Sequence, residues 1–189
     1  MLAYHAASAP HPSIPDAALL QPEDLGGATP EPVTGDYWSA LRPPQPCADR
    51  PYPSTASRRV DRAVSAMVGV GDRPTVVMAD VALYRGDGAH RYLRELRRAV
   101  AACDEPGPRD PRWTVLATGV AGDESVLLRL REYVDYAGTY KNTYLVAART
   151  GRVLVVVADA GWETGGGHEA LVRDLSTAAV RRADVINQR

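Results

Sequence analysis

From residue 58 onward, the chain alternates between segments with the two-residue period of a strand and segments with the period of a helix. Helical periodicity covers residues 89–103 and the segment that follows residues 165–167. The order is strand, strand, helix, four strands, helix. It predicts an α+β fold, with an antiparallel β-sheet of about five to six strands and two main helices on one face of the sheet. The strand pattern runs through residues 60–68, 75–84, 113–120, 125–133, 144–149 and 152–159.

The first 57 residues lack this periodicity and contain most of the prolines. Residues 1–13 are predicted to be a disordered tail, because their Ala, Pro, His and Ser side chains offer little apolar surface to bury. Residues 14–57 are interpreted as a proline-rich N-terminal arm. Residues 58–189 form the α+β core, and residues 14–189 together are predicted to form one domain.

Two short helices and one proline run organise the arm. Asp16 is a potential N-cap for a short helix, and Pro22 suits the first turn of a second one. The run from Arg42 to Pro46 suits neither a helix nor a central strand. An irregular connection of this length needs to be held in place, and Cys47 lies inside it.

Composition and charge exclude several kinds of partner. The 22 basic and 23 acidic side chains leave a net charge of −1, so nothing favours nucleic acid or an anionic membrane as a partner. No run of about 18 apolar residues exists, and we therefore expect no membrane span. Residues 1–5 lack the features of a signal peptide, which leaves a cytosolic protein or a mature chain whose targeting segment was removed. Lys141 is the only lysine, a bias typical of GC-rich bacteria such as actinomycetes.

The sequence contains no recognisable metal or cofactor motif. Its four histidines are scattered, and His168-Glu169 lacks the second histidine of a zincin motif. Cys47 and Cys103 lack the paired spacing of a zinc site. We therefore predict no metal and no cofactor.

Signals for a nucleophile or an anion site are equally weak. No G-x-S-x-G motif is present, and Ser125, which follows Asp123 and Glu124, suits a turn at the start of a strand. The triple glycine at 165–167 leaves backbone N–H groups uncovered by side chains just before a helix, an arrangement that also occurs in anion-binding sites. It also suits a loop that turns into a helix, with Glu169 stabilising the positive end. For Ser125 and for the triple glycine, a role in a turn or loop is favoured over a role in catalysis or anion binding.

Four tyrosines gather around the loop at residues 135–139. A tyrosine-lined groove suits sugars, peptides or envelope fragments, because the side chain combines an apolar ring with a hydroxyl. A chain without phenylalanine also needs tyrosine to fill its core. The residues alone leave both interpretations open for Tyr133, Tyr136, Tyr140 and Tyr144.

The two cysteines also allow two interpretations. A bridge between Cys47 and Cys103 would tie the arm to the end of the helix at 89–103, and would persist only in an oxidising compartment. Closing a loop of this length is worth about 4 kcal/mol in the chain-entropy treatment. Two buried thiols in a cytosolic protein are the other interpretation.

Several short segments match a known family in order and spacing. From about Ala17 to Ile186, the chain resembles the extracellular sensor-domain family of actinobacteria, typified by the outer domain of the mycobacterial serine/threonine kinase H and by related sensor-domain lipoproteins. The matching segments are residues 18–27, the cysteine after the proline-rich stretch, and residues 81–84, 89–103, 122–125 and 146–153.

This resemblance implies an extracytoplasmic, disulfide-bonded α+β domain with a cleft over an antiparallel sheet. It implies a bridge between Cys47 and Cys103, and a protein that is secreted or lipid-anchored at the cell envelope, without its targeting segment in this chain. Members of the family are regarded as ligand-sensing modules rather than enzymes. The kinase-linked members carry further cysteines, whereas this chain has two.

Three functional hypotheses follow. The first is a non-catalytic sensor that binds a small molecule, glycan or peptide in a cleft. The second is a small enzyme of secondary metabolism or envelope remodelling that uses Asp123, Glu124 or His168 as acid or base. The third is a structural partner of another envelope protein, which predicts a large exposed apolar patch. The ligand-binding candidates for the first hypothesis are Tyr84, Trp113, Tyr133, Tyr136 and Arg149.

Overall fold

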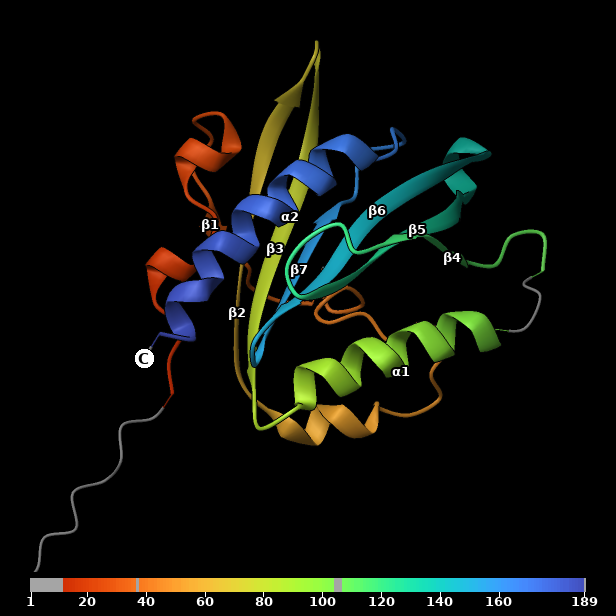
Figure 1. Ribbon diagram of the computed structural model, residues 1–189. Helices are drawn as coiled ribbons and strands as arrows, with labels where there is room; N and C mark the ends of the chain where they lie inside the picture. The colour runs from red at the N-terminus through yellow and green to blue at the C-terminus, as the bar shows by residue number, and fades with distance from the viewer. Residues whose placement is uncertain (1–11, 37, 104–106, 189) are drawn as a thin grey trace, which may run out of the picture.

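In the computed structural model, seven strands form one antiparallel sheet with two long helices packed against it (Figure 1). The structure describes residues 12–36, 38–103 and 107–188. Most of the predicted disordered tail therefore lies outside the described residues. The helices are α1 (Gly88–Ala102) and α2 (Glu169–Ala183). The sheet order is β1-β2-β3-β7-β6-β5-β4, with β1 (Glu31–Pro32), β2 (Arg58–Val70), β3 (Arg73–Tyr84), β4 (Arg112–Thr118), β5 (Glu124–Val134), β6 (Thr139–Thr150) and β7 (Val153–Asp159).

The α+β fold and its antiparallel sheet are confirmed, but the number of strands exceeds the prediction by one. The additional strand is β1, which contributes two residues inside the proline-rich arm. It pairs with the edge of β2, where Pro32 lies opposite Val64. Proline lacks an N–H and is tolerated at such an edge. Two residues are too few to show the alternating pattern that predicts a strand.

Two antiparallel ladders meet in the middle of the sheet. The predicted hairpin of β2 and β3 forms one ladder, and β4, β5 and β6 follow each other in a meander. β6 turns into β7 across Gly151, whose φ of 54° suits the tight connection. β7 then pairs with β3 and joins the two ladders. The last strand of the sequence is therefore central in space.

The two helices lie on opposite faces of the sheet, so the prediction of both on one face is wrong. Every residue of β7 is buried. Val155 faces the core that contains Val172 and Leu175 of α2, whereas Val156 faces the core that contains Leu93 of α1. The reason is visible in the uninterrupted apolar run of β7, because a strand with both faces covered does not alternate. Within the described parts of the chain, no helix has the length and apolar character to span a membrane.

The first part of the arm packs on the α2 face. It contains two 3₁₀-helices, η1 (Asp16–Ala18) and η2 (Pro22–Leu25). Pro22 lies in the first turn of η2 as predicted, but the N-cap of η1 is Pro15 rather than Asp16, and no side chain caps this helix. Arg182 of α2 holds η2 through ion pairs with Glu23 at 2.6 Å and with Asp24. Burial raises the pKa of Asp24, but the Arg182 guanidinium and the Gln21 amide hold this pKa below its usual value.

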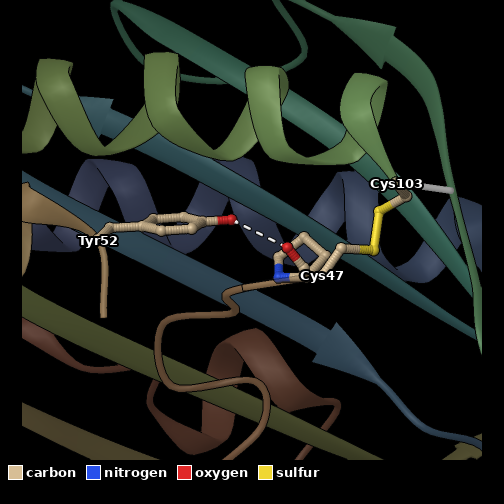
Figure 2. Close-up of a disulfide and its surroundings, with 4 residues drawn as sticks. Cys47, Tyr52 and Cys103 are labelled. Carbon is tan, nitrogen blue, oxygen red and sulfur yellow. Dashed lines mark hydrogen bonds between the residues drawn. A yellow bond between two sulfur atoms is a disulfide. The ribbon is translucent and has the colours of Figure 1, made fainter. Parts of the chain in front are cut away.

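The arm then passes the sheet edge at β1 and continues on the α1 face. A third 3₁₀-helix, η3 (Pro53–Ser57), packs against α1. The Tyr92 hydroxyl of α1 donates a hydrogen bond to the Pro44 carbonyl at 2.7 Å. Figure 2 shows Cys47 joined to Cys103 at the end of α1, with the Tyr52 ring beside the same loop. The structure thus contains the disulfide that the resemblance implies.

Candidate functional site

A groove of about 580 Å³ lies between the arm and the strands β4 and β5. Trp113 of β4 and Leu130 of β5 are direct neighbours in the ladder, and they lie on the α1 face of the sheet. The opposite wall is the arm around the proline run. The lining residues are Ser39, Ala40, Arg42, Pro43, Gln45, Pro46, Cys47, Arg58, Pro111, Trp113, Leu130 and Glu132.

A smaller hollow of about 190 Å³ adjoins the groove. The two share Ala40, Leu130 and Glu132 in their linings. Lys141 lies in the smaller hollow, and its amine is 3.5 Å from the carbonyl of Ala160. Together the two hollows make a trough that combines apolar side chains with the polar groups of Arg42, Glu132 and Lys141, and small-molecule sites also combine apolar and polar groups.

Charged residues beneath the arm hold the groove wall in place. The Arg42 guanidinium lies 3.4 Å from the Asp61 carboxylate and 3.5 Å from the Asp80 carboxylate. Arg58 lies 3.8 Å from Asp61 and donates a hydrogen bond to the Arg42 carbonyl at 3.2 Å. Both arginines also line the groove. Their charges are therefore largely committed to the sheet rather than free for a ligand.

Asp80 is the most perturbed carboxyl of this cluster. Its side chain is fully buried, and one of its oxygens has no hydrogen-bond partner. Burial and the neighbouring Asp61 carboxylate raise the pKa of Asp80 to about 7, against the opposing effect of Arg42. Asp80 does not line the groove. The raised pKa of Asp80 therefore reflects its buried contact with Arg42 of the arm, and not a role in the groove.

Trp113 is the one predicted ligand-binding residue that lines this groove. Tyr84 is 2% exposed and lies in the core beside Tyr92, with 6.4 Å between the ring centres. Burial raises the pKa of Tyr84. Tyr84 therefore fills the core and offers no surface to a ligand, which corrects its assignment to the cleft.

Tyr133 and Tyr136 lie at the far end of β5, around a separate shallow hollow of about 380 Å³. Tyr136 is 81% exposed at the turn into β6. Tyr133 packs edge to face against Tyr140, with 5.1 Å between the ring centres. These tyrosines do not join Trp113 in the groove.

Arg149 lies at the opposite end of β5 and β6, in an ion-pair network. It donates to Asp123 at 3.1 Å and lies 3.7 Å from Glu124. Glu124 also forms an ion pair with Arg97, and its carboxylate lies 2.8 Å from the His90 ring nitrogen. Burial raises the pKa of Glu124, but the hydrogen bonds from Arg97 and His90 hold it below its usual value. A carboxylate so fully paired is poorly suited to accept or donate protons in a reaction.

His168 is held far from these acids. Its ring nitrogen and its backbone N–H contact the buried Asp159 carboxylate at 3.0 and 2.7 Å. The neighbouring Gly167 donates to Asn142, which lies roughly 23 Å along β6 from Arg149 at the rise of a strand. Asp123, Glu124 and His168 therefore form no common site. Within the described residues, no group of three His, Cys, Asp or Glu side chains could hold a metal ion.

The triple glycine allows close packing of the backbone. A Cβ added at Gly167 would lie 2.1 Å from the Asp159 carbonyl oxygen, and one at Gly166 would lie 3.2 Å from the Asn142 carbonyl oxygen. Glycine is needed at position 167 because a Cβ has no space there, whereas a Cβ at position 166 would make a tight contact. The structure supports the structural interpretation of this run.

Comparison with known proteins finds a solved structure of similar fold. No protein-family model matches the chain, and no curated protein matches it. The crystal structure of the extracellular domain of PknH from Mycobacterium tuberculosis superposes with a TM-score of 0.55 and 13% sequence identity, over 95% of this chain and 100% of that chain. The two proteins share a fold.

Sequence reasoning missed most of the residues that line the groove. Arg42 and the prolines after it are distant in sequence from Trp113, and an irregular arm has no period that predicts what it covers. One signal was available: Trp113 and Leu130 fall at inward positions of two predicted neighbouring strands. A tryptophan at an inward position near the end of a strand indicates that another segment of the chain covers it, because its large apolar side chain is otherwise exposed to water.

Proposed function

We propose that this protein is a non-catalytic binding module that holds a small molecule, glycan or peptide in the groove between the arm and β4–β5. The observation that carries the proposal is the groove, with Trp113 and Leu130 on one side and the arm on the other. Its volume lies in the range of small-molecule sites, about 300 to 1,000 Å³. The polar groups at its sides would orient the ligand.

The separation of the acid and base candidates supports binding rather than catalysis. Glu124 is paired with cationic groups, and His168 is paired with Asp159 at a distant part of the sheet. A general acid or base must reach the reacting proton within hydrogen-bond distance. None of these residues lines the groove.

We further propose an extracytoplasmic location, secreted or anchored at the cell envelope. Disulfides persist in oxidising compartments and are rare in the cytosol. The bridge between Cys47 and Cys103 supports this location. The likeness in fold to the extracellular domain of PknH agrees with a sensor-like role.

The groove can be tested by filling it from the arm side. Ala40 is exposed and lines both hollows, so Ala40→Trp should occupy the trough without disturbing the core. Ala48→Trp is the matched control, because Ala48 is exposed in the same arm but outside the lining. Isothermal titration with muropeptides, short peptides and neutral oligosaccharides should find ligands that bind the wild type and Ala48→Trp, and bind Ala40→Trp at least about tenfold more weakly.

Two outcomes would contradict the proposal. Equal affinity of a ligand for Ala40→Trp and wild type would place binding elsewhere. Chemical conversion of a bound ligand, detected by its mass after incubation, would favour the small-enzyme hypothesis instead.

A further inference from the structure

The face of β4, β5 and β6 opposite the groove carries a second group of aromatic and cationic residues. Arg112 of β4 lies directly opposite Arg131 of β5 in the ladder. Successive side chains of a strand point to opposite faces, so this pair faces away from Trp113 and Leu130. We call this surface the arginine–tyrosine face, defined by Arg109, Arg112, Arg131, Tyr133 and Tyr140.

Its arginines and tyrosines are stacked on one another. The Arg131 guanidinium lies 3.9 Å from the centre of the Tyr140 ring, and that of Arg109 lies 4.7 Å from the centre of the Tyr133 ring. The two rings pack edge to face at 5.1 Å. Tyr140 also donates a hydrogen bond to the Pro108 carbonyl. Such stacking holds the guanidinium planes in place while their edges remain open.

Within residues 12–36, 38–103 and 107–188, no carboxylate is paired with Arg112 or Arg131. Asp110 lines the same depression as both arginines, but its carboxylate accepts from the Gly107 amide and makes no ion pair with either arginine in the described part of the chain. Like charges directly opposite each other on neighbouring strands repel. Arg109 forms an ion pair with the exposed Asp135, at 3.8 Å. An anion placed between Arg112 and Arg131 would remove their repulsion.

The face is hollowed rather than flat. A depression of about 370 Å³ lies between the loop that precedes β4 and the strands β5 and β6. α2 packs mainly on β6 and β7 and leaves this part of the sheet open (Figure 1). Both Arg112 and Arg131 are exposed. The lining is Gly107, Pro108, Asp110, Arg112, Arg131 and Tyr140.

We propose that the arginine–tyrosine face binds an anionic carbohydrate. Guanidinium groups recognise carboxylate or phosphate by paired hydrogen bonds. The Tyr140 ring offers an apolar edge for the sugar ring. The Asp110 carboxylate, which accepts from the Gly107 amide at 2.8 Å, adds an acceptor for sugar hydroxyls. A bare anion would use the arginines alone, whereas an acidic sugar would use all three kinds of group.

The proposal is tested with four probes at low ionic strength. Trigalacturonate carries carboxylates, glucose 6-phosphate carries a phosphate, maltotriose is neutral, and inorganic phosphate lacks the sugar. We expect at least one anionic sugar to bind at least about tenfold more tightly than maltotriose and inorganic phosphate. The better of the two anionic sugars identifies the recognised group. Equal binding of all four probes, or of none, would overturn the proposal.

Variants locate the site. Arg112→Gln and Arg131→Gln should each weaken binding of the anionic sugar at least about tenfold. Arg98→Gln is the matched control, because Arg98 is exposed on α1 at the other side of the sheet. Equal weakening by Arg98→Gln would indicate attraction by overall charge and would contradict a site.

Arg112→Glu separates binding from folding. The new carboxylate would lie opposite Arg131 and replace a repulsive pair with an attractive one. We expect the melting temperature to stay equal or rise, while binding of the anionic sugar is lost. Retained binding in this variant would refute the assignment. Ala40→Trp should leave binding on this face unchanged, so the test does not depend on the groove.

Discussion

Single residues of this protein show how burial changes chemistry. Asp80 and Asp159 are both fully buried carboxyls on neighbouring central strands. Asp159 accepts hydrogen bonds from His168, from the Gly161 amide and from Thr75. Asp80 has one oxygen without a partner and a neighbouring Asp61 carboxylate. The pKa of Asp80 is raised because burial and the Asp61 carboxylate outweigh the hydrogen bond and charge of Arg42.

Asp80→Asn should therefore remove a pH dependence of stability. Unfolded Asp80 ionises near pH 4, whereas folded Asp80 keeps its proton until about pH 7. The free energy of unfolding of the wild type should then fall as the pH rises from about 4 to about 7, by on the order of 4 kcal/mol. Urea unfolding across this range should give a flatter profile for Asp80→Asn. Asp72→Asn, at the exposed tip of the β2–β3 hairpin, should keep the wild-type slope; identical slopes for all three proteins would contradict the prediction.

At the scale of elements, the start of α2 depends on close approach of backbone segments. Gly167 lies against the Asp159 carbonyl at the end of β7, and Gly166 lies against Asn142 of β6. The helix can begin directly above the sheet because these positions have no side chain. His168 then bonds to Asp159 and fixes the first turn.

Gly167→Ala should destabilise the protein strongly, because its Cβ would lie 2.1 Å from a backbone oxygen that cannot rotate away. We expect a loss of about 2 to 4 kcal/mol in the free energy of unfolding. Gly69→Ala is the matched control, since a Cβ there meets nothing within 4 Å. This control should stay within about 0.5 kcal/mol of the wild type or exceed it. Denaturant titration distinguishes the two, and equal stabilities would disprove the packing argument.

At the scale of the whole molecule, the arm links the two faces of the sheet. Its first part is held on the α2 face by Arg182, and its later part is held on the α1 face by Tyr92 and by the disulfide. The bridge joins residues 56 positions apart in the sequence. Because Cys47 lines the groove and Cys103 follows α1, the bridge fixes the arm side of the groove to the end of α1.

Replacement of both Cys47 and Cys103 by serine should lower the free energy of unfolding by about 2 to 4 kcal/mol, through loss of the loop closure. Amide hydrogen exchange should rise in residues 41–57 more than in β7, because the arm loses a covalent anchor. The wild type under reducing conditions should match the double variant. The intact wild-type mass should be lower by two hydrogen atoms without reduction than after it. Unchanged exchange in the arm of the double variant would contradict the anchoring of the arm by the bridge.

The sequence predicted the main strands and helices, because their periodicity records which side chains are buried, but β6 begins at Thr139 rather than at the predicted residue 144. It also predicted the β2–β3 and β6–β7 hairpins, two short helices between residues 14 and 25 and, through the resemblance, the disulfide, but not η3. It placed both helices on one face, although the uninterrupted apolar run of residues 153–158 was typical of a strand covered on both faces. Trp113 and Tyr84 were both predicted to line a cleft, but Trp113 lines the groove whereas Tyr84 lies in the core.

Only the tertiary structure decided where the sites are. Arg42 and Trp113 face the same groove because an aperiodic arm is folded over the sheet by ion pairs and a disulfide, and no local pattern encodes such a contact. Arg112 and Arg131 meet because β4 and β5 pair in one register, and a shift of one residue would send the two to opposite faces. The spacing of apolar residues within a segment determines whether that segment forms a helix or a strand, because it sets which side chains share the buried face. The grooves depend on contacts between distant segments, which only the packed molecule specifies.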